Sequence, residues 1–114
     1  MTSEFTALRD QLRNFARERE WLSYHDAKNL AMAVASEAGE LLAELRWLSP
    51  DEASSAHLDA NQLGAIRHEI ADVFIFLVRL ADVLEVDLMA SVQEKLALNA
   101  VRFPRVERGE SSVD

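Results

Sequence analysis

The chain has 114 residues, 49% of them apolar, and its 20 acidic and 12 basic residues give a net charge of −8. This length fits one domain, and the acidic balance argues against nucleic acid and anionic membrane surfaces as partners. The lack of cysteine excludes disulfides and thiolate zinc sites. With neither a signal peptide nor a run of 18 apolar residues in the sequence, we expect a cytoplasmic protein.

The spacing of apolar residues predicts an all-α fold, because they recur every three or four positions without sustained alternation. The first helix is expected from about Ser3 to Glu20. A connector over residues 21–25 follows. Asp26 is a candidate N-cap for the second helix, which we expect to continue to about Leu48.

Ser49 and Glu52 have the spacing of a capping box, with proline between them at the first helical position. This pattern predicts a short helix that ends near His57.

Asp59 and Gln62 have the same spacing and predict the start of a third long helix, which extends to about Glu85. Asp87 can cap a last helix, which must end before Pro104 because the residue preceding a proline disfavours helical backbone.

The predicted elements indicate a single all-α domain over residues 1–104, a four-helix-type bundle, followed by a polar, flexible tail over residues 105–114. Broad apolar faces on the second and third helices favour assembly into a homo-oligomer.

Four carboxylates fall on helix faces that are otherwise apolar: Glu37, Glu40, Glu69 and Asp72. The members of each pair lie three residues apart, about one helical turn, and therefore share a face. Burying them uncompensated costs several kcal/mol per ion, whereas Mg²⁺ and Ca²⁺ prefer carboxylate oxygens. The pattern predicts a magnesium site, with Mn²⁺ as a substitute. The alternative is a set of salt bridges, although few bases fall on the inner faces of these helices.

Glu44 lies within about 60° of the first pair around the helix axis, so it is a candidate to bind metal or orient a water. Glu40 and Glu44 are the candidate catalytic residues. The opposite side of the third helix is expected to face solvent with its polar residues Arg67, His68, Arg79, Asp82 and Glu85.

Lys95, Asn99 and Arg102 follow one stripe of the last helix. Two cations beside an acidic metal site suit the outer phosphates of a triphosphate. The alternative interpretation is a solvated basic edge.

Trp21 and Trp47 bracket the second helix, and such rings either stack on a nucleobase or anchor a core or interface. His25 and Asn29 stand near the start of the same helix, where they could contact a base or sugar.

The two acidic motifs, Glu37-Ala-Gly-Glu40 and Glu69-Ile-Ala-Asp72, are separated by 28 residues. This pattern resembles that of the MazG-like all-α nucleoside triphosphate pyrophosphohydrolases. The segments most similar to the dCTP pyrophosphatase branch are WLSYHDAKNL (21–30), EAGELLAELRW (37–47) and KLALNAVRFP (95–104). Leu12 and Phe76 depart from the pattern, since relatives can carry histidine and tyrosine at these positions.

The resemblance implies hydrolysis of a nucleoside triphosphate to monophosphate and pyrophosphate by a helical homodimer or dimer of dimers. It implies Mg²⁺ held by the four acids of the two motifs, phosphate contacts from Lys95 and Arg102 with Asn99 nearby, and Trp21, His25 and Trp47 around the base. Phe76 is the expected counterpart of a base-contacting tyrosine. A dCTP-like substrate and a role in cleaning the nucleotide pool follow as expectations.

Two alternatives remain. One is a non-catalytic helical oligomerisation or adaptor module, for which the apolar faces would suffice. The other, within the same superfamily, is a phosphoribosyl-ATP pyrophosphohydrolase, which a substrate panel distinguishes.

Overall fold

The computed structural model describes residues 3–107. In this range the chain is all-helical and contains no β-strand, which confirms the predicted fold class. Its elements in chain order are α1 (Glu4–Glu18), the 3₁₀ helix η1 (Leu22–Tyr24), α2 (Ala27–Leu45), α3 (Ala60–Val83) and α4 (Leu88–Arg102). Most of the expected tail, residues 108–114, lies outside the described residues.

Each α-helix begins at a short polar side chain that accepts a hydrogen bond from the backbone amide three residues further on. These N-caps are Ser3, Asp26, Asp59 and Asp87. At α3 the predicted capping box is complete: Asp59 Oδ1 accepts from the Gln62 amide at 2.8 Å, and Gln62 Oε1 accepts from the Asp59 amide at 3.0 Å. Because caps are local chemistry, these starts agree with the sequence prediction.

The ends of α1 and α3 share a Schellman geometry, with a glutamate in the left-handed region just beyond the cap. Glu20 has φ 59° and Glu85 has φ 57°. In α3, the amides of Glu85 and Val86 donate to the carbonyls of Asp82 and Ala81. Without the usual glycine to mark these turns, the sequence prediction extended each helix by two residues.

The short helix expected after Pro50 is wrong, since residues 50–57 form a series of turns. The capping-box bonds between Ser49 and Glu52 do form, at 2.8 and 3.1 Å. However, Ser54 Oγ and His57 Nδ1 both lie within hydrogen-bond distance of the Asp51 carbonyl oxygen, at 2.8 and 2.9 Å. These side chains occupy an acceptor that a continuing helix would need.

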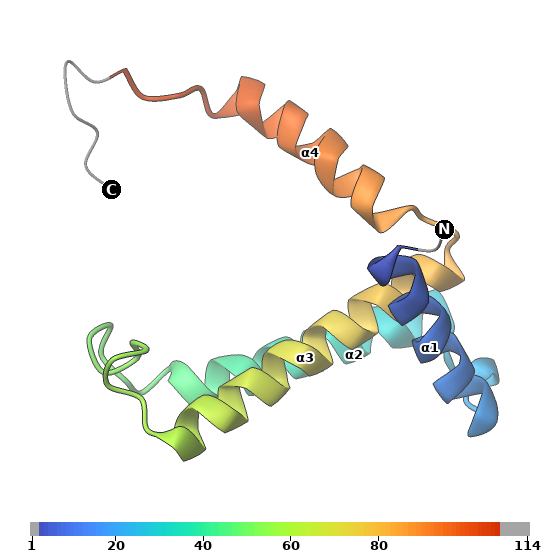
Figure 1. The fold of residues 1–114 in the computed structure, drawn as a ribbon, viewed down its shortest axis with the longest axis horizontal. Helices are drawn as coiled ribbons and strands as arrows, with labels where there is room; N and C mark the ends of the chain where they lie inside the picture. Colours follow the sequence, from blue (N-terminus) through green and yellow to red (C-terminus); the bar gives the residue numbers. More distant parts are fainter. Residues whose placement is uncertain (1–2, 108–114) are drawn as a thin grey trace.

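The long helices α2 and α3 run antiparallel and form the most extensive helix–helix contact, while α1 crosses α3 near its C-terminal end (Figure 1). The core is small, and its buried apolar residues are Ala16, Leu30, Ile66, Val78 and Ala81. Ala16 belongs to α1, Leu30 to α2 and the other three to α3, so all three helices contribute to the core.

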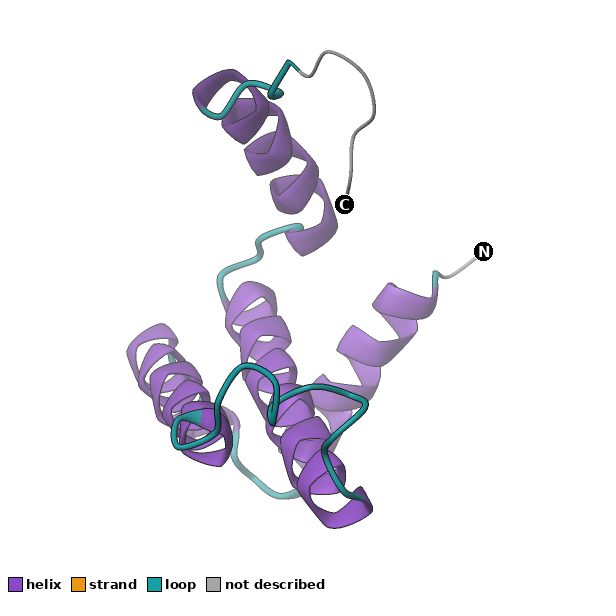
Figure 2. Ribbon diagram, turned by 90° about the vertical axis from the view of Figure 1, so that its left-hand side faces the viewer, coloured by secondary structure: helices purple, strands orange, loops and turns teal. Residues whose placement is uncertain are grey.

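Helix α4 extends away from the other three in both views (Figures 1 and 2). Large apolar side chains of α4 are exposed, among them Val101 at 83%, Leu96 and Leu98, and so is Phe103 at its C-cap. The Cα radius of gyration is 18.0 Å, against about 13 Å for a compact domain of this length. No described helix is long and apolar enough to cross a membrane.

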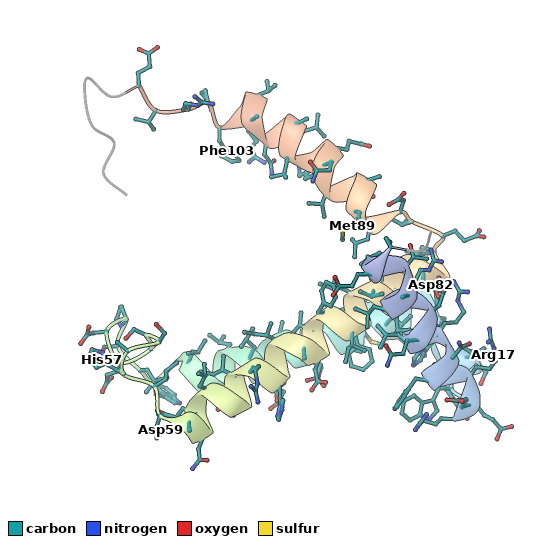
Figure 3. All side chains as sticks on the ribbon, viewed as in Figure 1. Arg17, His57, Asp59, Asp82, Met89 and Phe103 are labelled. Carbon is teal, nitrogen blue, oxygen red and sulfur yellow. The ribbon has the colours of Figure 1, made fainter. Side chains whose placement is uncertain are left out.

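The expectation that Arg79 and Asp82 face solvent is wrong. Arg79 is only 3% exposed, and its Nη1 donates to Asp82 Oδ2 at 2.7 Å. Asp82 also accepts from Arg13 of α1, at the α1–α3 junction (Figure 3). Helix α1 covers this part of α3, so a side that is polar in sequence becomes an internal ionic contact.

Candidate metal and nucleotide site

Three of the four expected acids converge where α2 and α3 pack together. Glu37, Glu69 and Asp72 each place a carboxylate oxygen within 4.8 Å of the others, and all three side chains are half-buried. Glu37 comes from α2 and the other two from successive turns of α3, so the antiparallel helix pair creates the cluster. The paired motifs predicted a site of four acids, and these three are the ones that lie together.

Glu69 has the least favourable environment of the three. Its Oε2 is buried and has no hydrogen-bond partner among residues 3–107. Burial raises the pKa of Glu69, and the adjacent Glu37 carboxylate and the charges of Asp72 and Glu40 raise it further. An ionised carboxylate in this position lacks a compensating positive charge.

The salt-bridge alternative fails in the described part of the chain, where no lysine, arginine or histidine pairs with any of these acids. Converging carboxylates with an unpartnered oxygen fit a hard divalent cation, which prefers oxygen ligands. The side chains of the cluster can therefore hold a metal ion.

Glu40 and Glu44 lie outside the three-acid cluster. Both are exposed on α2. Glu40 is near enough for its charge to raise the pKa of Glu69. Glu44 stands one turn beyond it.

A pocket of about 250 Å³ adjoins the acid cluster through Asp72. Its lining combines aromatic and aliphatic side chains with three polar ones: Leu12, Phe15, Ala16, Trp21, His25, Asp72, Ile75, Phe76 and Arg79. A concave apolar site with a few convergent polar groups is typical of a small-molecule site. The structure thus brings the expected Trp21, His25 and Phe76 together.

Sequence reasoning missed Phe15, Ile75 and Arg79 as pocket residues. The helical signal was present on α3, because Ile75, Phe76 and Arg79 follow Asp72 at the three-, four- and seven-residue spacings of one helix face. Phe15 packs edge-on against Trp21, with ring centroids 5.8 Å apart, a contact between residues on either side of a turn.

Two expected base contacts lie elsewhere in this single chain. Asn29 Nδ2 donates to the Tyr24 carbonyl at 3.1 Å and to Asp26 Oδ2 at 3.0 Å, so it secures the start of α2. Trp47 follows α2 and is 84% exposed, with the Arg46 guanidinium 5.3 Å from its ring centroid.

The basic stripe of α4 does not reach the acid cluster within its own chain. Lys95 and Arg102 are exposed and Asn99 is half-buried. Helix α4 makes no extensive contact with another described helix, and Phe103 marks its distant end (Figure 3).

Behind the pocket, an ionic network joins three parts of the chain. Arg13 donates to Asp82 through Nε at 2.8 Å and Nη2 at 2.6 Å. Asp82 also binds Arg79, whose Nε donates to His25 Nδ1 at 3.1 Å. The Arg13 hydrogen bond lowers the pKa of Asp82 despite its burial. Burial, and then the charge of Arg79, lower the pKa of His25. Both effects favour the neutral form of the ring.

No model of a known protein family matches the sequence. Human dCTP pyrophosphatase 1 is 36% identical over 90 residues, which are 79% of this chain and 53% of the human protein. The rat protein of the same name is 37% identical over equal shares. The chain spans about half the length of these curated relatives. A pyrophosphatase from Archaeoglobus fulgidus, a solved structure, superposes with a TM-score of 0.83 at 36% identity, covering 92% of this chain and 96% of that chain.

Proposed function

The chain belongs to the MazG-like all-α pyrophosphohydrolase family, in its dCTP pyrophosphatase branch, and on this premise we propose that it hydrolyses a (deoxy)nucleoside triphosphate to monophosphate and pyrophosphate. The observation that carries the proposal is the three-acid cluster opening onto an aromatic pocket through the shared residue Asp72. A triphosphate bound at the acids would place its base in that pocket. The substrate is a dCTP-like pyrimidine nucleotide.

We propose that Glu37, Glu69 and Asp72 hold Mg²⁺, with Mn²⁺ as a substitute, and that Glu40 joins them as the fourth ligand. When bound, the cation supplies charge neutralisation for the triphosphate and Lewis acidity for the attack of water on phosphorus. The carboxylates position it, and the half-buried site limits competing water.

Glu40 and Glu44 are the proposed catalytic residues. Both are solvent-exposed carboxylates beside the cluster, so either can accept the proton of the attacking water at a carboxylate oxygen. Trp21, His25 and Phe76 contact the base, while Asn29 and Trp47 are proposed to lie at the edge of the bound nucleotide.

The phosphate contacts are proposed to come from α4 of a second copy of the chain. Lys95, Asn99 and Arg102 cannot complete the acid site from the position of α4 in their own chain. The exposed apolar residues of α4 support burial against a partner, because isolated apolar surface of this extent favours association. The proposed assembly is a homodimer or a dimer of dimers.

The proposed role is removal of surplus or modified nucleotides from the cytoplasmic pool. The net charge of −8 disfavours a nucleic acid or an anionic membrane as a partner.

The test is incubation with dCTP, the other common nucleotides and phosphoribosyl-ATP in the presence of Mg²⁺, with detection of pyrophosphate. We expect turnover of dCTP and loss of activity in Glu69→Gln. Glu18→Gln removes an exposed carboxylate from the end of α1 and serves as the matched control. Release of orthophosphate alone would contradict the proposal, and the absence of any turnover would favour an adaptor module.

A further inference from the structure

The hydrogen bond between Arg79 and His25 determines which ring nitrogen of the histidine carries the proton. Arg79 Nε lies 3.1 Å from His25 Nδ1. A guanidinium is always protonated and has no acceptor, so Arg79 must be the donor in this contact. His25 Nδ1 therefore accepts and carries no proton. The neutral ring has its proton on Nε2.

The contact between Arg79 and the His25 ring is fixed, because Asp82 also binds the Arg79 guanidinium. It is 3% exposed, and its Nη1 donates to Asp82 Oδ2 at 2.7 Å. Asp82 is fixed in turn by both nitrogens of Arg13. The imidazole also lies 6.2 Å, between centroids, from the ring of Trp21. The network thus restrains both the rotation of the imidazole and the position of its proton.

The pocket offers few other polar groups to a ligand. The polar groups among its lining residues are the side chains of His25, Asp72 and Arg79 and the indole N–H of Trp21. Asp72 belongs to the acid cluster. His25 Nε2 has no hydrogen-bond partner within residues 3–107. In a largely apolar pocket, a fixed hydrogen-bond donor discriminates strongly between ligands. A ligand that lacks an acceptor at this position leaves the donor N–H unpaired, which costs binding free energy.

Building on the proposed nucleotide activity, we propose that Arg79 is a positioning residue that holds His25 in the Nε2–H tautomer, and that this N–H donates to a ring carbonyl oxygen of the nucleobase. Every pyrimidine base has such an oxygen, at position 2. Adenine has none. The device therefore favours pyrimidine over adenine nucleotides, even though Leu12 and Phe76 contribute no polar group to the pocket.

The first test measures the tautomer directly, by NMR of the protein labelled with ¹⁵N in its three histidines, His25, His57 and His68. The His25→Gln spectrum assigns the His25 signals. We expect the neutral Nε2–H form in the wild-type protein at pH 7, and a tautomer mixture in Arg79→Met. In that variant Asp82 keeps Arg13 as its partner, and a thermal melt verifies folding. An Nδ1–H or doubly protonated wild-type ring overturns the proposal. The result requires no turnover, so it is independent of the proposed hydrolysis.

The second test compares the affinities for dCMP and dAMP by calorimetry. His25→Leu should lower the dCMP-to-dAMP affinity ratio at least tenfold. His25→Gln should recover part of it, because a glutamine amide N–H can reach the place of Nε2. His57→Gln, in the loop between α2 and α3, should match the wild type. Equal weakening of both nucleotides in His25→Leu, or no weakening, overturns the donor role. Selective dCMP binding without pyrophosphate release would instead reject the hydrolysis while retaining this inference.

Discussion

At the scale of single residues, Glu69 carries an electrostatic cost in the metal-free chain. Its buried oxygen faces other carboxylates, and this environment raises its pKa. The native chain therefore binds a proton more tightly than the unfolded chain between the ordinary and the raised pKa. Stability from this residue is greatest below that window and falls as the pH rises through it.

The pH dependence of the Glu69 contribution predicts how Mg²⁺ should affect the stability of the protein. The cation needs ionised carboxylates, so it should raise the melting temperature more at pH 7.5 than at pH 5. At a hundredfold excess over its Kd, a ligand that binds only the native state contributes about 2.7 kcal/mol. Thermal melts with and without Mg²⁺ measure the effect. In Glu69→Gln the difference between the two pH values should shrink. An equal Mg²⁺ effect at both pH values would contradict this account.

The pKa of Asp82 is shifted in the opposite direction to that of Glu69, because its hydrogen bonds with Arg13 lower it. Its contribution to stability is present above its ordinary pKa and is lost as the pH falls through the lowered value. In Asp82→Asn the buried Arg79 loses its counter-charge. We expect a loss of about 3 kcal/mol, as for other broken buried pairs. Urea unfolding at fixed protein concentration measures it.

The matched control for this substitution is Asp10→Asn. Asp10 pairs with Arg9 at 3.0 Å and, at 3.8 Å, with Arg13, but its side chain is 45% exposed. A surface pair of this kind contributes about 1 kcal/mol or less. Comparable losses in the two variants would show that burial does not strengthen the Asp82 contacts.

Among single residues, the sequence indicated three clustered acids and part of the pocket lining, but it did not indicate Phe15, Ile75 or Arg79. Glu37, Glu69 and Asp72 follow from helical spacing and from the rarity of carboxylates on apolar faces. Arg79 has the same spacing signal, but only the docking of α1 determines that it is buried rather than solvated. Likewise, the sequence predicts Asn29 as a ligand contact but does not show that its side chain bonds to Tyr24 and Asp26.

At the scale of elements, the starts of helices were easier to predict than their ends. An N-cap such as Asp59 is a single side chain with a preferred identity. The C-termini of α1 and α3 instead use Glu20 and Glu85 at positive φ, where glycine is the usual signal. The loop before α3 shows that a capping box alone does not predict a helix, because its capping hydrogen bonds form but no helix follows them.

The left-handed backbone of Glu85 predicts a stabilising substitution. A residue with a Cβ is strained at φ 57°, by about 1–2 kcal/mol relative to glycine. Glu85→Gly should therefore raise the free energy of unfolding by about 0.5–1 kcal/mol after the entropy of glycine in the unfolded chain is included. Glu85→Ala retains the Cβ and should give no such gain. Chemical denaturation of the two variants side by side tests the difference.

At the scale of the whole molecule, α4 contributes little to the core of its own chain. Its exposed apolar side chains and the large radius of gyration support the proposed homo-oligomer. Val101→Glu places a charge on this apolar surface. We expect the substitution to shift the protein towards smaller species in light scattering, while circular dichroism retains the helical signal. Val101→Leu is the control and should keep the wild-type mass.

The detached position of α4 has a consequence for protein mixtures. Under the proposed assembly, each reaction centre combines acids from one copy with the basic stripe of another. Glu69→Gln and Lys95→Ala would then be inactive separately, yet their co-refolded mixture would contain some centres with both components intact. Such a mixture should recover up to about a quarter of the wild-type rate on simple random pairing of copies. If every centre drew all its groups from a single copy, mixing the two defective proteins would restore nothing.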